Sequence, residues 1–292
     1  MTDLQAKYDK QVKKLLANEA ILAWILKTCT EEFSSLELEQ IVRCIDGKPE
    51  VAMKAVHAID LDADEAEGRI SSDKSIEGLN TEDMSLKEQS VYYDIRFNAK
   101  VPGDDSFIEL IINIEAQLNP SPGYPIEKRA IYYCCRLISS QYGSIFTHSE
   151  YGKIRKVYSI WFCPDPAQKR RNTIKRISLT ENPLYGEPDT CRQDVDLLQA
   201  VIVNLGDPES DMDNQILRLM NVLLSSEKTA EEKKKVMQDE FHIAMTVNLE
   251  SEVSELCNLS LGIYNEGLEA GMEKGMEEGM EKGMEKGIII SV

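Results

Sequence analysis

Asp94, Glu115 and Gln117 are the residues whose types and spacing could do chemistry. Hard divalent cations such as Mg²⁺ prefer oxygen ligands, and proteins often hold them with one or two carboxylates together with a substrate phosphate. Such a cation can polarise a phosphodiester and lower the pKa of a bound water. If the two carboxylates face one point, they form a cation site that needs neither histidine nor cysteine.

The pattern around these residues predicts two strands that would position them. Apolar residues stand at every odd position of 91–99 and at every even position of 107–117. A period of two predicts a strand with one face on the core, and the short Pro-Gly connection predicts a hairpin. Because the pleat returns every second side chain to one face, we expect Asp94, Glu115 and Gln117 on a shared polar face. The alternative is that this face is only the wet side of the sheet.

The charge of the chain is unevenly distributed. The formal net charge is −18, yet residues 121–180 carry eleven Lys and Arg against three Asp and Glu. A basic segment inside an acidic protein is typical of a confined phosphate-facing surface, and a solvated, self-compensating face fits the same counts. Both interpretations stay open at this level.

Composition disfavours several other kinds of site. The seven cysteines are scattered and include no CxxC pair, which predicts reduced, mostly buried thiols. The three histidines lie far apart, so a multi-histidine metal centre is not expected. No window resembles a membrane span and the N-terminus lacks the apolar run of a secretory signal, so we expect a cytoplasmic protein with no membrane partner.

Five segments follow one another along the chain. Helical apolar spacing in 1–56 predicts an N-terminal helical segment that packs on the core, and the acidic, turn-rich 57–90 predicts a loop region. Strand, helix and strand patterns in 91–205 predict an α/β core, and 206–262 predicts two helices. The final segment, 263–292, contains a repeat. The order of these elements favours the mixed α/β class.

The repeat reads GLEA GMEK GMEE GMEK GMEK G from Gly267 to Gly287. A glycine at every fourth residue puts six glycines on one stripe of a helix, each costing about 1 kcal/mol relative to alanine. Such a helix would not stand alone. It is expected either to pair with a second copy, giving a homo-oligomer, or to remain a mobile acidic tail, and we prefer the mobile tail.

A family resemblance adds to this pattern. The run YYDIRF, followed after a turn by IINIEAQ and a helix opening with EKRAIYY, resembles the Asp…Glu-x-Gln variant of the PD-(D/E)XK nuclease-like transposase family, also described as Rpn-type recombination-promoting nucleases. KYDKQVKKLL, the GLNTED stretch, KVYSIWFC and the tail also resemble its members, so the likeness covers most of the chain. It implies a restriction-endonuclease-like mixed sheet flanked by helices, and an endonuclease that cuts DNA with Mg²⁺ or Mn²⁺ in recombination or transposition.

Carried over residue by residue, the resemblance makes Asp94 and Glu115 cation ligands and adds Gln117 to the catalytic set. Gln117 stands where the parent motif has lysine. Lysine can stabilise charge and help orient the attacking water, whereas glutamine is neutral and only forms hydrogen bonds. Either a neighbouring cation compensates for the missing charge, or the enzyme depends more heavily on the metal.

The helix after the hairpin offers candidates for that cation. Arg129 and Tyr133 are four residues apart and would share a helix face, and with Lys128 they are candidate phosphate-binding residues. If that face looks toward the hairpin, Arg129 would contact the scissile phosphate. The alternative is that the tyrosines are core residues and the basic side chains are solvated.

A further carboxylate could come from Asp9 or Glu19 in the N-terminal segment, or from Glu82, although a charge on an amphipathic helix usually marks its solvated face. The leading expectation is a metal-dependent endodeoxyribonuclease. The rival is a nuclease-fold protein that has lost catalysis and serves as a DNA-binding or assembly module.

Overall fold

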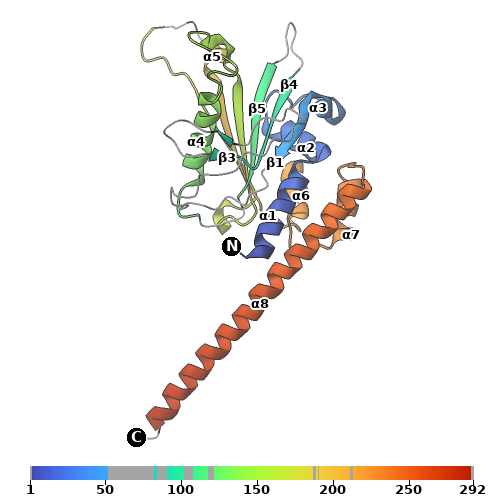
Figure 1. Cartoon of the computed structure of the whole chain (residues 1–292), viewed down its shortest axis with the longest axis vertical. Helices are drawn as coiled ribbons and strands as arrows, with labels where there is room; N and C mark the ends of the chain where they lie inside the picture. Colours follow the sequence, from blue (N-terminus) through green and yellow to red (C-terminus); the bar gives the residue numbers. More distant parts are fainter. Residues whose placement is uncertain are drawn as a thin grey trace, which may run out of the picture.

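A six-stranded mixed sheet with helices on both faces organises the chain (Figure 1). The computed structural model describes residues 2–51, 82–83, 91–101, 108–117, 122–186, 189, 191–210 and 213–290. The sheet has the order β1-β4-β5-β6-β8-β7, with β5, β6 and β8 parallel and the other pairs antiparallel. Its strands are β1 (Ile45–Val51), β4 (Ile95–Val101), β5 (Ile108–Ala116), β6 (Lys156–Cys163), β8 (Leu198–Asn204) and β7 (Thr173–Ser178). The expected mixed α/β class is confirmed.

The helices divide between the two faces of the sheet. One large core lies against α1 (Asp3–Leu16), α2 (Glu19–Cys29), α3 (Leu38–Cys44), α6 (Gln215–Leu223), α7 (Ala230–Asp239) and the start of α8 (Val247–Ile290). The second core lies under α4 (Ile126–Ser139). Short helices η1 (Tyr151–Lys153), η2 (Gln168–Arg170) and α5 (Arg192–Val195) lie in the connections. Both faces of the sheet are therefore covered.

The predicted hairpin is confirmed, with one change. β4 pairs antiparallel with β5, and Ile95, Phe97 and Ala99 alternate into the large core as the period of two requires. The expected strand 91–99 is interrupted, however, because β3 (Val91–Tyr92) pairs with β2 (Glu82–Asp83) in a separate small sheet. The chain bends at Asp94 before β4 begins.

Neither edge strand of the sheet was predicted from the sequence. β1 lies inside the segment 1–56, which was expected to be helical. The strand was not predicted because IDGKPEV has no apolar alternation and contains Gly47 and Pro49. Proline is tolerated on an edge strand, where a ladder donor is not needed. β7, with the sequence TIKRIS, forms the other edge, and lysine on an edge discourages pairing with another chain.

Several smaller expectations can also be compared with the structure. The loop region 57–90 lies outside the described residues except for β2. All seven cysteines are free thiols and four of them are buried, as predicted. Over the part of the chain that the structure describes, no helix is both long and apolar enough to cross a membrane.

The repeat continues α8 as one helix. The mobile tail and the pairing with a second copy both stay predictions. The first turns of α8 are held by buried Leu249, Val253 and Leu256 and lie along α1 and α7. The helix then runs away from the body (Figure 1). Because nucleation is the costly step of helix formation, a docked first half allows the glycine-rich half to propagate from it.

The projecting part of α8 carries an exposed apolar stripe. Its members recur every fourth residue and are half or more exposed: Tyr264, Leu268, Met272, Met276 and Met280. Isolated exposed apolar residues are ordinary, but a row of them on a free helix is expected to associate with a partner of similar shape.

We therefore expect the chain to self-associate through this stripe. Deleting residues 267–292, or making the double substitution Met272→Glu and Met276→Glu, should reduce the mass measured by light scattering to that of a monomer without lowering the unfolding temperature of the body. Glu273→Gln with Glu277→Gln is the matched control on the same helix. An unchanged mass after the deletion would contradict self-association through this helix.

Candidate functional site

Asp94 and Glu115 meet where β4 begins and β5 ends. The hairpin register pairs Ile95 with Ile114, so the next positions outward are Asp94 and Glu115. The Asp94 backbone N–H donates to Glu115 Oε1 at 3.1 Å, and Asp94 Oδ2 accepts from the Ala116 N–H at 2.9 Å. The two carboxylates take the place of ladder carbonyls at the end of the hairpin. This exchange fixes both side chains and accounts for the bend at Asp94.

Helix α1 brings a lysine and a third carboxylate to this point. Lys13 Nζ lies 2.7 Å from Asp94 Oδ1 and 2.7 Å from Asp9 Oδ2. Asp9 and Lys13 are four residues apart, so they share one face of α1. The Lys13 side chain is only 2% exposed. An ammonium group thus bridges two buried acids from distant parts of the sequence.

Helix α4 contributes a guanidinium held among aromatic rings. Arg129 Cζ lies 5.1 Å from the ring centre of Tyr133, 5.3 Å from that of Trp161 and 5.5 Å from that of Tyr124. Its Nε and Nη2 donate to Tyr133 Oη at 3.1 and 2.7 Å, and its Nη1 donates to Tyr124 Oη. Because cation–π contacts and hydrogen bonds hold the guanidinium together, Arg129 is preorganised beside the carboxylates.

These side chains line one small cavity. It has a volume of about 10 Å³ and is lined by Asp9, Lys13, Asp94, Glu115, Ala116, Gln117 and Arg129. That space is close to the minimum for a single water molecule. A larger group such as a phosphate would have to bind at the mouth of the cavity.

Burial and charge shift the proton equilibria of the site. Burial raises the pKa of Glu115 well above its usual range, and the Asp94 charge raises it further, while the Asp94 N–H, Arg129 and Lys13 oppose these effects. Burial lowers the pKa of Lys13, but Asp94 and Asp9 outweigh it and the net shift is upward. Lys13 therefore carries its charge in the folded protein, and Glu115 binds a proton more tightly than an exposed carboxyl does.

The polar face of the hairpin is buried, so the alternative of a wet sheet face is wrong. Asp94, Arg96, Glu115 and Gln117 are all less than a tenth exposed. α4 packs over this side of the sheet, which a period of two could not reveal. Burying these polar groups is costly unless they are paired, and Asp94 and Glu115 are each engaged by backbone N–H groups.

Some candidate residues reach the cavity and others do not. Arg129 lines it and Tyr133 orients Arg129, whereas Lys128 is exposed and does not line it. Asp9 lines the cavity, but Glu19 is exposed in the first turn of α2. The side chain of Glu82 lies outside the described residues.

Lys13 is the residue that sequence reasoning missed. Asp9, Val12, Lys13 and Leu16 are all buried on α1, so the predicted apolar face contains an acid and a lysine at i, i+4 spacing. That pair was the available signal, because two opposite charges within an apolar stripe can be buried together. Nothing in the local sequence indicates that they meet Asp94.

The basic segment 121–180 is largely compensated within the chain. Its ion pairs join Lys153 to Glu150, Lys156 to Glu32 and Asp196, Arg170 and Lys175 to Glu127, Arg171 to Asp165, and Arg176 to Glu31. This pattern favours the self-compensating interpretation for most of these charges. Lys128 and Lys169 are exposed and have no ion pair among the residues described.

The types of donor atom at the cavity suit a hard cation, but their present arrangement is not that of a metal site. Among the described residues, no group of three or more His, Cys, Asp or Glu side chains has the arrangement of a preformed metal site. The cavity is nevertheless lined by oxygen donors of the type that Mg²⁺ takes, from Asp9, Asp94, Glu115 and Gln117. The ammonium of Lys13 already neutralises Asp94 and Asp9 from one side.

Comparison of the chain with family models, with curated proteins and with solved structures finds no match in any of the three.

Removing the buried ammonium should destabilise the fold. Lys13→Met removes the ammonium that bridges Asp9 and Asp94, and breaking a buried ion pair in this way costs about 3 kcal/mol or more. The free energy of unfolding in urea should fall by that amount. Lys14→Met, at the exposed neighbouring position, should change it by less than about 0.5 kcal/mol. Equal effects of the two substitutions would show that the ion pair contributes nothing specific.

The raised pKa of Glu115 predicts a pH-dependent stability. The folded protein holds this proton more tightly than the unfolded chain, whose carboxyl has the ordinary pKa of 4.5, so stability is lost as pH rises from that value through the raised pKa. Glu115→Gln keeps an acceptor for the Asp94 N–H but cannot ionise. Relative to wild type it should gain stability between pH 5 and pH 8 in urea unfolding. Glu255→Gln, at an exposed position, should show no such trend, and a trend of opposite sign for Glu115→Gln would contradict the assignment.

Proposed function

We propose that this protein is a metal-dependent endodeoxyribonuclease that hydrolyses DNA phosphodiester bonds with Mg²⁺ or Mn²⁺. The observation that carries the proposal is that Asp94 and Glu115 line one cavity together with Lys13 of α1, whose ammonium pairs with Asp94. Two carboxylates can hold a divalent cation, and a nearby ammonium can donate hydrogen bonds to a phosphate oxygen. The resemblance of the sequence to PD-(D/E)XK nucleases and the mixed sheet flanked by helices support the same conclusion.

Asp94 and Glu115 would hold the cation, with Asp9 as a third carboxylate at the same cavity. When bound, the cation supplies a Lewis acid that polarises the phosphodiester and lowers the pKa of water. Burial and, to a smaller extent, the charge of Asp94 raise the Glu115 pKa, and a positive ion at this position would oppose both effects. The cavity is lined by three carboxylates against the two positive charges of Lys13 and Arg129, so a cation would offset the remaining negative charge.

Lys13 would supply the positive charge that Gln117 lacks. Its ammonium is fixed by Asp9 and Asp94 at the cavity, where it can donate hydrogen bonds to a phosphate oxygen or orient the attacking water. Arg129 also lines the cavity, held by Tyr133 and Tyr124, and would contact the phosphate. Gln117 would then orient water or substrate through hydrogen bonds alone.

DNA is the proposed substrate because the resemblance is to DNA-cutting enzymes of recombination and transposition. The exposed basic side chains of Lys128, on α4, and Lys169, on η2, would contact the backbone of a bound duplex. The overall charge of −18 requires such contacts to be local, so binding should weaken steeply with salt.

A second candidate is a nuclease-fold protein without catalysis that binds DNA or assembles a complex. The observation that favours it is that Lys13 already pairs with Asp94, in a cavity of only about 10 Å³. In this alternative the ammonium is a permanent replacement for a metal ion.

Plasmid nicking by the purified protein tests the leading proposal. Wild type with Mg²⁺ should nick supercoiled DNA, and Asp94→Asn, Glu115→Gln and Lys13→Met should each reduce the rate by at least about 100-fold. Lys14→Met and Glu255→Gln should retain the wild-type rate. Loss of nicking in the site variants alone, purified in the same way, excludes a contaminating nuclease. Equal nicking by all five variants would remove the support for the assigned site.

Binding of Mn²⁺, followed by electron paramagnetic resonance in the same preparations, separates the two candidates. A catalytic site should bind the ion and lose it in Asp94→Asn, whereas a degenerate site should bind none in either protein.

A further inference from the structure

A row of four residues crosses the sheet from the cavity of the candidate site to the edge strand β7. Glu115 of β5 pairs with Trp161 of β6, and Trp161 pairs with Ile202 of β8. Ile202 pairs in turn with Lys175 of β7. Paired residues share one face of a sheet, and α4 covers this face, because Trp161 and Ile202 belong to the second core. Three strand spacings of about 4.8 Å place the Cα of Lys175 about 14 Å from that of Glu115.

The first turn of α4 connects the two ends of this row. Glu127 pairs with Lys175 of β7, and Arg129 lines the cavity beside Glu115. Lys128 stands between them in the sequence and is exposed. Successive residues of a helix point about 100° apart, so Lys128 faces solvent while its two neighbours contact the row.

Four basic side chains gather around Glu127 at the β7 end of the row. Lys175 and Arg170 both pair with its carboxylate, Arg170 at 3.8 Å. Lys169 precedes Arg170 in η2, and Lys128 follows Glu127 in α4. Lys128, Lys169, Arg170 and Lys175 together are called the basic corner below.

The basic corner carries more positive charge than its neighbours neutralise. Of the acids that the structure describes, Glu127 alone forms an ion pair with any of these four residues, which leaves four positive charges against one negative charge. Arg170 is 56% exposed and Lys175 is 43% exposed, and both other members are exposed. In a chain of net charge −18, such a local excess is typical of a confined surface for a polyanion.

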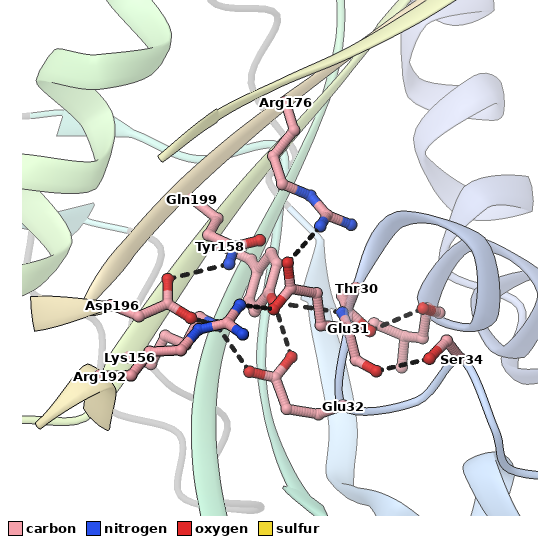
Figure 2. Close-up of polar contacts among 11 residues, drawn as sticks. Thr30, Glu31, Glu32, Ser34, Lys156, Tyr158, Arg176, Arg192, Asp196 and Gln199 are labelled. Carbon is pink, nitrogen blue, oxygen red and sulfur yellow. Dashed lines mark hydrogen bonds and ion pairs between the residues drawn. The ribbon is translucent and has the colours of Figure 1, made fainter. Parts of the chain in front are cut away.

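The basic residues next to the corner do not extend it. Arg171 pairs with Asp165 at 3.3 Å. Arg176 follows Lys175 on β7 and therefore points to the other face of the sheet, where it pairs with Glu31 at 2.5 Å (Figure 2). The surplus charge thus stays on the face that α4 covers, which is also the face of Glu115.

We propose that the basic corner binds the phosphate backbone of a DNA duplex, and that the Glu127 carboxylate holds a phosphate position in the free protein. The choice of DNA rests on the proposed function. A carboxylate and a phosphate oxygen accept the same charge-assisted hydrogen bonds from lysine and arginine. When a duplex binds, its phosphates replace Glu127 as the partners of Arg170 and Lys175, and they also contact Lys128 and Lys169.

The row sets the length of duplex that the two ends can contact together. At roughly 3.4 Å per base pair, about 14 Å corresponds to about four base pairs. A duplex lying along the first turn of α4 would therefore place one phosphate at Arg129 and another, about four base pairs away, at Lys175.

Fluorescence anisotropy of a labelled DNA duplex with the full chain in EDTA tests the proposal without cleavage. We expect saturable binding that weakens as salt rises. Lys128→Gln and Lys169→Gln should each weaken binding severalfold, and each should lower the slope of log K against log salt by about 0.9, because one phosphate contact is lost. Lys235→Gln, at an exposed position on α7, is the matched control and should keep the wild-type affinity and slope.

Glu127→Gln should have the opposite effect. It keeps the length of the side chain but removes the charge that competes with phosphate, so duplex binding should tighten at least about threefold at low salt. Glu255→Gln, which removes one negative charge at an exposed position elsewhere, should leave the affinity unchanged.

Several results would contradict the basic corner as the binding surface. These are no duplex binding by wild type, wild-type affinity in both lysine variants, an equal loss in Lys235→Gln, or weaker binding in Glu127→Gln. Tighter binding of an RNA duplex of the same sequence would contradict the choice of DNA. Because the measurement needs neither a divalent cation nor cleavage, a lack of nicking with intact binding would count against the nuclease proposal alone.

Discussion

The ion pairs of Lys13 with Asp9 and Asp94 are the interaction on which the candidate site depends. They attach α1 to the open end of the β4–β5 hairpin, and they place a positive charge beside two carboxylates that would otherwise repel each other in a buried position. Because an isolated buried charge is far more costly than a paired one, the three residues can be buried only together. The same contact therefore determines the position of α1, the burial of Asp94 and the electrostatics of Glu115.

The bend at Asp94 ends the ladder of β4 and also fixes the two carboxylates of the candidate site. Because β4 begins only at Ile95, the Asp94 and Ala116 N–H groups are free of the ladder, and the two carboxylates accept them instead. A side chain that replaces a ladder carbonyl has little freedom, so the site is rigid before any ligand arrives. Side chains that are already fixed before a ligand binds reduce the entropy lost on binding. Arg129, enclosed by three aromatic rings, is preorganised on the same principle.

The two ends of the parallel strands differ in chemistry. At the end of β5 the side chains are carboxylates, an ammonium and a guanidinium around a cavity that admits about one water molecule. At the start of β6 and β8 a larger pocket of about 310 Å³ lies beside the ion pairs of Lys156 with Glu32 and Asp196 (Figure 2). The two ends of the parallel strands therefore carry different sets of charged groups.

The sequence by itself determined the elements whose periodicity is local: the hairpin, the strand β6, α4 with Arg129 and Tyr133 on one face, and the convergence of Asp94 with Glu115 at one end of the hairpin. Only the tertiary structure decided that α4 buries the polar face, that Lys13 from α1 completes the site, that β1 and β7 form the edges, and that α8 extends through the repeat. The physical reason is that spacing along the chain fixes which face a side chain occupies. Which segment covers that face depends on contacts between segments far apart in sequence. Such contacts produce no periodic pattern in the local sequence.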